Sequence, residues 1–146
     1  MSKEIIAKAI EIINKNTMHA AMLNTCPYCI LSLIELNGYP TAAAISPSKA
    51  DGIRWITFGT GIRSNKANRI KKCNCASVCF CSENYNITLT GIIEIVTDPI
   101  IKTEMWYDGL KNHFTGPENP EYCVLRFMTE SYNLFVDWNE VRGELK

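Results

Sequence analysis

WITFGTGIRSNKANRIKK, residues 55–72, is the most informative segment of this sequence. Its first part is apolar and rich in β-branched and aromatic residues, which is typical of a strand, and it stops at Gly59-Thr-Gly61. Ser64 then has the side chain of a helix N-cap, and Lys66 and Arg69 follow in the first turns. The segment therefore predicts a strand, a glycine-containing turn and a helix.

The cations at the start of this helix indicate an anion site. Lys66 and Arg69 oppose the helix dipole, so helix stability does not account for them. Free backbone N–H groups, the dipole and the side chains of Arg63, Ser64 and Lys66 would together form a phosphate site. The alternative interpretation is a strand–turn–helix junction with a solvated basic face.

The whole chain restricts what the anion can be. Its 146 residues are enough for one domain with a real core, and we expect a single domain over 1–146. Fifteen Lys and Arg balance fifteen Asp and Glu, so no long basic surface is left over for nucleic acid or a membrane. No segment is apolar for long enough to span a bilayer. A small anionic ligand is expected rather than a polymer.

The N-terminus indicates a cytoplasmic protein, and that location would decide the state of the seven cysteines. The sequence begins Met-Ser-Lys-Glu and continues as an amphipathic segment, unlike a signal peptide. In the cytosol the cysteines would be reduced thiols rather than a disulfide framework. Cys75, Cys79 and Cys81 have the spacing of one strand face, where we expect them to act as small buried hydrophobic residues.

Hydrophobic periodicity predicts a mainly β chain of the α+β class. We expect helices over 3–15, 64–72 and 99–111, and strands over 29–36, 40–45, 53–58, 77–81, 86–96, 122–128 and 132–138. Asn37-Gly38 predicts a hairpin turn, and Gly91 a β-bulge. Because most strands follow one another without an intervening helix, the pattern favours an antiparallel barrel with a few flanking helices.

The order of these motifs resembles the pyridoxamine 5′-phosphate oxidase-like family of FMN-binding split barrels, and particularly its small general-stress and nitroimidazole-reductase (Nim)-like members. The resemblance covers about residues 15–138. It rests on the Asn-Gly-x-Pro hairpin, on Arg-Ser-x-Lys at residues 63–66 and on the long strand that contains Gly91. It implies a six-stranded antiparallel split β-barrel, a homodimer and FMN in the groove between the subunits.

The resemblance also implies where the cofactor would lie. The phosphate would be held by Arg63, Ser64 and Lys66, in agreement with the interpretation above. Small residues, Ala42, Ala43 and Ala44, would lie along the isoalloxazine ring, and Thr57 and Phe58 at the end of the third strand would also contact the cofactor. Thr90 and Trp138 would come from the partner subunit and close the pocket.

The implied function is an FMN-dependent oxidoreductase that passes electrons from a reduced nicotinamide or another donor to a small-molecule acceptor. No side chain stands out as a general acid or base, so no catalytic residue is assigned. Thr90 precedes Gly91 where the vitamin-forming oxidases have an arginine, and the chain ends at Lys146 without their C-terminal recognition segment, so pyridoxamine phosphate is not the expected substrate. A non-catalytic flavin-binding stress protein, and heme or a deazaflavin in place of FMN, stay open.

A competing motif is Cys26-Pro-Tyr-Cys29, which matches the glutaredoxin active site. That chemistry needs the first cysteine at a helix N-terminus, whereas a strand-like run follows here. A thiol oxidoreductase that uses Cys26 and Cys29 is therefore a further alternative. Together with Cys73 and Cys75 the pair would supply four zinc ligands, but Cys-x-Cys is a poor zinc knuckle and no metal is expected.

Overall fold

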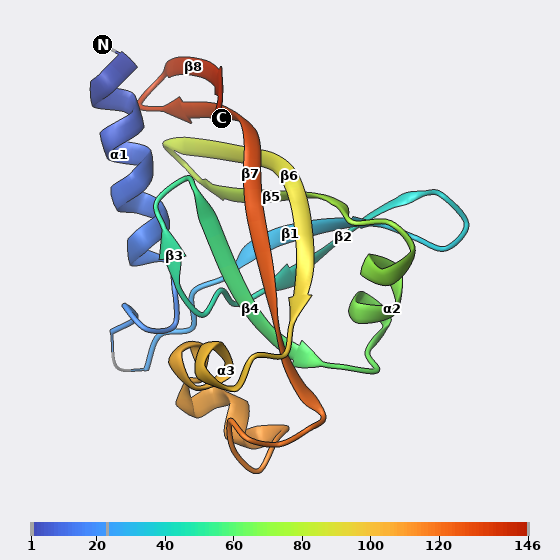
Figure 1. Ribbon diagram of the computed structural model, residues 1–146. Helices are drawn as coiled ribbons and strands as arrows, with labels where there is room; N and C mark the ends of the chain where they lie inside the picture. Colours follow the sequence, from blue (N-terminus) through green and yellow to red (C-terminus); the bar gives the residue numbers. More distant parts are fainter. Residues whose placement is uncertain (1, 23, 146) are drawn as a thin grey trace.

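The computed structural model describes residues 2–22 and 24–145, and its main feature is one eight-stranded antiparallel sheet that curls into a split barrel (Figure 1). The strand order is β2-β1-β5-β6-β7-β4-β3, with β8 paired to β7. The elements are α1 (Ser2–Lys15), β1 (Cys29–Ile34), β2 (Pro40–Ile45), β3 (Ala50–Asp51), β4 (Trp55–Gly61), α2 (Asn65–Lys72), β5 (Cys75–Ser82), β6 (Tyr85–Val96), α3 (Pro99–Met105), the 3-10 helix η1 (Asp108–Asn112), β7 (Tyr122–Val136) and β8 (Asn139–Glu144). The predicted mainly β split barrel is confirmed.

The bulge at Gly91 bends the two longest strands, β6 and β7. Their register shifts between Thr90 and Gly91, so that Thr90 faces Ser131 and Gly91 faces Thr129. A Cβ atom on Gly91 would overlap the carbonyl oxygen of Met128, which leaves glycine as the residue that fits. The predicted bulge is confirmed, and it gives the sheet the local bend that closing a barrel requires.

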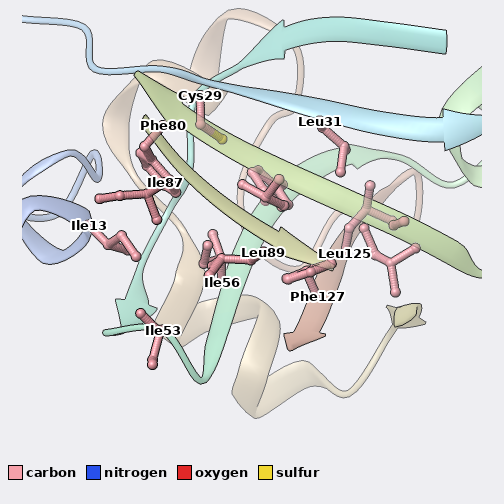
Figure 2. Packing of buried hydrophobic residues seen from close by; sticks show 14 of the residues in the cluster. Ile13, Cys29, Leu31, Ile53, Ile56, Phe80, Ile87, Leu89, Leu125 and Phe127 are labelled. Carbon is pink, nitrogen blue, oxygen red and sulfur yellow. The ribbon is translucent and has the colours of Figure 1, made fainter. Parts of the chain in front are cut away.

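Alternate residues of the strands fill the barrel interior. Figure 2 shows Leu31 of β1, Phe80 of β5, Ile87 and Leu89 of β6, and Leu125 and Phe127 of β7 pointing into one common core. Helix α1 covers one end of the barrel with Ile5, Ala9 and Ile13, each at most 2% exposed. This apolar stripe is the face that the 3–15 periodicity predicted.

Three predicted elements differ from the structure near the C-terminal half. Residues 122–128 and 132–138 are not two strands but parts of one, β7, which turns at Asp137 and Trp138 into β8. The sequence pattern does not indicate β8, because Asn-Glu-Val-Arg-Gly-Glu has almost no apolar alternation. The helix predicted over 99–111 ends at Met105, where the C-cap Trp106 is extended with ψ 140°, and η1 replaces its second half.

The strand count is the other correction, because the structure has eight strands where the resemblance implied six. The additions are the two-residue β3 and the hairpin strand β8.

Over the residues described here, no helix has both the length and the hydropathy that crossing a bilayer requires.

Candidate functional site

The N-terminus of α2 is built as the 55–72 segment predicts. Ser64 is the N-cap, with φ −69° and ψ 163°, and its Oγ accepts a hydrogen bond from the Ala67 N–H at 3.2 Å. Thr60, the next-to-last residue of β4, donates to the same Oγ at 3.2 Å. The amides of Asn65 and Lys66 have no acceptor among the described residues, so this helix end presents free N–H groups.

Arg63 stands at the surface beside this helix end and is held by a carboxylate. Its Nε and Nη2 donate to the two carboxylate oxygens of Glu121, at 3.1 and 2.6 Å. The side chain of Arg63 is 81% exposed, so one side of the guanidinium stays open to solvent. Glu121 is not among the predicted site residues, because it lies 58 positions from Arg63 and no local sequence pattern indicates a contact at that range.

Arg69 connects α2 to the β1–β2 hairpin. It is only 17% exposed, donates from Nη1 to Thr41 Oγ1 at 2.7 Å, and lies 3.5 Å from a Glu35 carboxylate oxygen. Thr41 directly precedes Ala42 on β2. The arginine therefore fixes the alanine-containing strand beside the helix that begins at Ser64, as the position of α2 next to β2 in Figure 1 illustrates.

Strand β2 is one edge of the sheet. It pairs with β1 on one side and ends the strand order on the other, and Ala42, Ala43 and Ala44 are all exposed. An edge strand carries unpaired N–H and C=O groups, and methyl side chains let a flat molecule approach them closely. The structure thus joins two sets of predicted site residues, at 42–44 and at 63–66, through Arg69.

Thr57 and Phe58 are not at the surface with these residues. Both side chains have 0% exposure, and Phe58 lies in the main core. The Thr57 hydroxyl has two acceptors within reach of its one proton, the Lys49 carbonyl at 3.3 Å and Met105 Sδ at 3.1 Å. β4 continues to Gly61, so in the protomer these two side chains support the middle of that strand from inside and do not end it.

Thr90 and Trp138 lie elsewhere on the molecule. Thr90 is exposed on the outer face of β6, between Ser77 and Ser131. Trp138 is 82% exposed in the β7–β8 turn and packs edge-on against Phe135, with 5.7 Å between the ring centroids. Since β8 lies beside α1 and away from α2 (Figure 1), one protomer does not bring Trp138 to the α2 N-terminus.

The Cys26–Cys29 motif lacks the geometry of a dithiol active site. Cys29 opens β1, is 2% exposed, and has a thiol pKa raised by burial. Cys26 is exposed, with its Sγ 3.5 Å from Ser46 Oγ, and no helix begins at either residue. A reactive pair needs an accessible, stabilised thiolate, which burial of Cys29 opposes.

The prediction for the β5 cysteines is wrong. Cys75 and Cys81 are exposed and Cys79 is half-buried, because Ala76, Val78 and Phe80 occupy the inward positions of β5. Within the described part of the chain, no three His, Cys, Asp or Glu side chains are arranged to hold a metal ion.

Comparison with known proteins agrees with this architecture. No curated protein matches the sequence. The structure is similar to a protein of Clostridium acetobutylicum related to general stress protein 26 (pyridoxinephosphate oxidase family), with 23% identity, coverage of 99% of this chain and 96% of that one, and a TM-score of 0.78. It is also similar to general stress protein 26 of Bacillus anthracis, with 20% identity, coverage of 97% and 98%, and a TM-score of 0.72.

A third structural relative is a pyridoxamine 5′-phosphate oxidase-related, FMN binding protein of Nostoc punctiforme, with 12% identity, coverage of 99% and 94%, and a TM-score of 0.65. At these identities the structures show the shared fold. In the sequence itself, the model of the pyridoxamine 5′-phosphate oxidase family matches residues 17–135, which include β1 to β6 and nearly all of β7. The chain therefore belongs to the pyridoxamine 5′-phosphate oxidase family.

Proposed function

We propose that this chain is an FMN-binding flavoprotein, one domain over 1–146, that acts as an oxidoreductase on a small-molecule acceptor. One observation supports this more than any other. The free α2 N-terminus, with Arg63 and Lys66 beside it, is joined through Arg69 to an exposed edge strand of three alanines. These two features match the two ends of flavin mononucleotide, because the helix end would bind its phosphate and the strand edge would contact its flat ring.

The residues present fit that group. Two free amides and two cations suit a phosphate dianion, since charge-assisted hydrogen bonds are the strong ones. Ser64 Oγ accepts hydrogen bonds from Thr60 Oγ1 and from the Ala67 N–H, so that the helix end is ordered before an anion arrives. Arg69 sets the distance between phosphate and ring positions. The flavin, when bound, would supply the electron transfer, and the chain would bind and orient it.

The proposal includes a homodimer. Trp138 lies in the β7–β8 turn, on the side of the barrel away from α2, so it reaches a flavin at the α2 N-terminus only if a second protomer supplies it. Thr90, exposed on the outer face of β6, is proposed to come from the same second protomer. In such a dimer each protomer holds one phosphate and closes the other site. Balanced charge makes nucleic acid and membranes poor partners. The cytoplasm is the expected location, and the cysteines would be reduced there.

The first test is the visible absorption spectrum of the purified protein, followed by acid release of any chromophore and its identification by mass. Released FMN is the expected result. A colourless protein that takes up no added FMN would contradict the proposal, and released heme or a deazaflavin would replace the cofactor. Anaerobic titration with reduced nicotinamides then separates an oxidoreductase, in which the flavin is reduced and reoxidised by acceptors, from a non-catalytic flavin-binding protein.

A further inference from the structure

A polar pocket of about 350 Å³ lies on the outer face of β5, β6 and β7, where no predicted site residue lies. Its lining residues come from the β5–β6 hairpin, from β7 and from β8. They include Glu83, Tyr85, Asn86, Thr88, Asn133 and Phe135. This end of the hairpin lies toward β8, on the side of the barrel away from α2 (Figure 1).

The pocket has an acceptor that the protein leaves without a partner. Asn133 Oδ1 is buried and makes no hydrogen bond in the described structure. Beside it, on the neighbouring strand, Asn86 Oδ1 accepts from Cys79 Sγ at 3.4 Å and from Thr88 Oγ1 at 3.5 Å. A buried acceptor without a donor costs about 1–3 kcal/mol. A ligand with an N–H group would remove that cost at Asn133.

The charge of the pocket favours a cation. Glu83 and Glu140 both line it, and no lysine or arginine does so among the residues that the structure describes. Glu140 is paired with Arg142, at 3.3 Å between Oε1 and Nε, whereas Glu83 is in no ion pair within the described chain. A phosphate or carboxylate ligand would meet repulsion here, because like charges nearby are unfavourable in a partly enclosed site.

Aromatic side chains flank the same pocket. Tyr85 and Phe135 line it, and Trp138 packs edge-on against Phe135 at an interplanar angle of 86°. Trp138 has φ +67° and Asp137 φ +50°, the left-handed conformations that a two-residue hairpin turn requires and that glycine or asparagine usually supplies. A tryptophan kept exposed in a strained turn is a candidate for ligand contact, since strain of this kind concentrates at functional sites.

We propose that this pocket binds a small planar organic cation that carries N–H donors, with Asn133 as acceptor, Glu83 as counter-ion and the aromatic rings as a cation–π surface. Resting on the proposed function, the pocket is the substrate site of the flavin that the second protomer holds. Thr90 is the next outward residue after Thr88 on β6, and Trp138 contacts Phe135, so both residues expected to close the flavin site border the pocket. The substrate would therefore carry no phosphate.

The test uses the full-length protein and benzamidine, a planar aromatic amidinium, with benzoate as the matched anion. Binding is followed by the indole N–H resonance of Trp138 in ¹H–¹⁵N spectra, assigned with Trp138→Phe. We expect saturable shifts with benzamidine and none with benzoate. Asn133→Leu and Glu83→Gln should each weaken benzamidine binding at least threefold, and Glu118→Gln, an exposed carboxylate outside the pocket, should not. Glu83 lies in an exposed turn, so its variant keeps the test decisive if Asn133→Leu does not fold.

Two outcomes overturn the cation site: equal binding of benzoate, or unchanged benzamidine affinity in Glu83→Gln. The link to the flavin has its own readout. In protein loaded with FMN, benzamidine should perturb the flavin absorption band, and binding without that perturbation would refute the substrate assignment. If the protein binds no FMN, the proposed function fails, while the resonance of Trp138 in the unloaded protein still decides whether the pocket takes the cation.

Discussion

Arg63 and Glu121 form a bidentate ion pair next to the free N-terminus of α2, with N–O distances of 2.6 and 3.1 Å. The pair orients the guanidinium, and it also keeps a carboxylate beside the place where an anion would bind. Both side chains are well exposed, at 81% and 48%, so the pair contributes less than about 1 kcal/mol to stability. Its main consequence is electrostatic, because Glu121 cancels part of the positive potential of the site.

Glu121→Gln should therefore tighten FMN binding by about threefold to fivefold, because it removes a like charge near the phosphate and frees Arg63. Flavin fluorescence quenching at low and at physiological salt would measure the effect, and added salt should reduce it. Glu118→Gln, three residues earlier and without a bond to Arg63, is the control. Weaker FMN binding in Glu121→Gln would mean that Glu121 serves chiefly to position the arginine.

Removing the positive charges of Arg63 and Lys66 should weaken only the part of FMN binding that depends on the phosphate. In the double variant Arg63→Ala with Lys66→Ala, we expect at least about a 100-fold loss of FMN affinity, since each charge-assisted hydrogen bond is worth about 1.5–3 kcal/mol. Riboflavin, which lacks the phosphate, should bind the variant and the parent protein equally. Unchanged FMN affinity would refute the phosphate site at residues 63–66.

A larger side chain on the edge strand β2 should instead weaken the binding of the flavin ring. Ala43→Leu places a branched side chain where the flat ring is proposed to lie, and we expect FMN and riboflavin affinity to fall together by at least tenfold. The exposed strand position should tolerate leucine without loss of fold. Equilibrium titrations with both flavins check this, with Ala7→Leu on the exposed face of α1 as the control. Loss of FMN binding alone would place the ring elsewhere.

The fold was predictable wherever local patterns determine structure. Ser64, the Asn37-Gly38 turn and the apolar stripe of 3–15 each act within a few residues, and all three predicted elements are present. Strand β8 was not predictable from the sequence. It forms through backbone hydrogen bonds to β7, and its mostly polar side chains show no alternation of apolar and polar residues. The prediction that the β5 cysteines are buried failed for a related reason. Alternation along a strand shows which residues share a face, but it does not indicate which of the two faces points into the core.

The candidate site was predictable only in its local part. Ser64 and the cations next to it are contiguous in sequence, whereas Glu121, Thr41 and Asn133 enter through contacts between distant segments. Thr57 was expected along the ligand, yet its hydroxyl is used inside the protein by Lys49 and Met105. Alternation along β4 fails at this point because η1 and α3 bury the face that would otherwise be exposed.

Cys123 should make the protein less stable at alkaline pH. Burial raises the pKa of its thiol from the ordinary value of 9.0 to about 11. Between these values the unfolded chain loses the proton and the folded protein keeps it, so the free energy of unfolding falls as pH rises from about 9 to about 11. Burial raises the pKa values of Cys29 and Tyr122 too, with the same sign. Urea unfolding from pH 8 to 11 should give a slope shallower by up to about 1.4 kcal/mol per pH unit in Cys123→Ala. Equal slopes would contradict the assignment.

Trp138→Gly should separate stability from ligand binding. With φ +67° in a two-residue turn, Trp138 occupies a conformation that costs a non-glycine residue about 1 kcal/mol, and Asp-Gly is a preferred sequence for such turns. The edge-on contact with Phe135 is lost, but both rings are at the surface end of the hairpin, so we expect a melting temperature at or above that of the parent. Affinity for FMN and for benzamidine should nevertheless fall, because the exposed ring is proposed to close the flavin site and the cation pocket. Asp137→Asn, which keeps the tryptophan and suits the same turn, is the control and should bind both ligands normally. A glycine variant that is more stable and also binds as well as the parent would show that Trp138 has no part in either site.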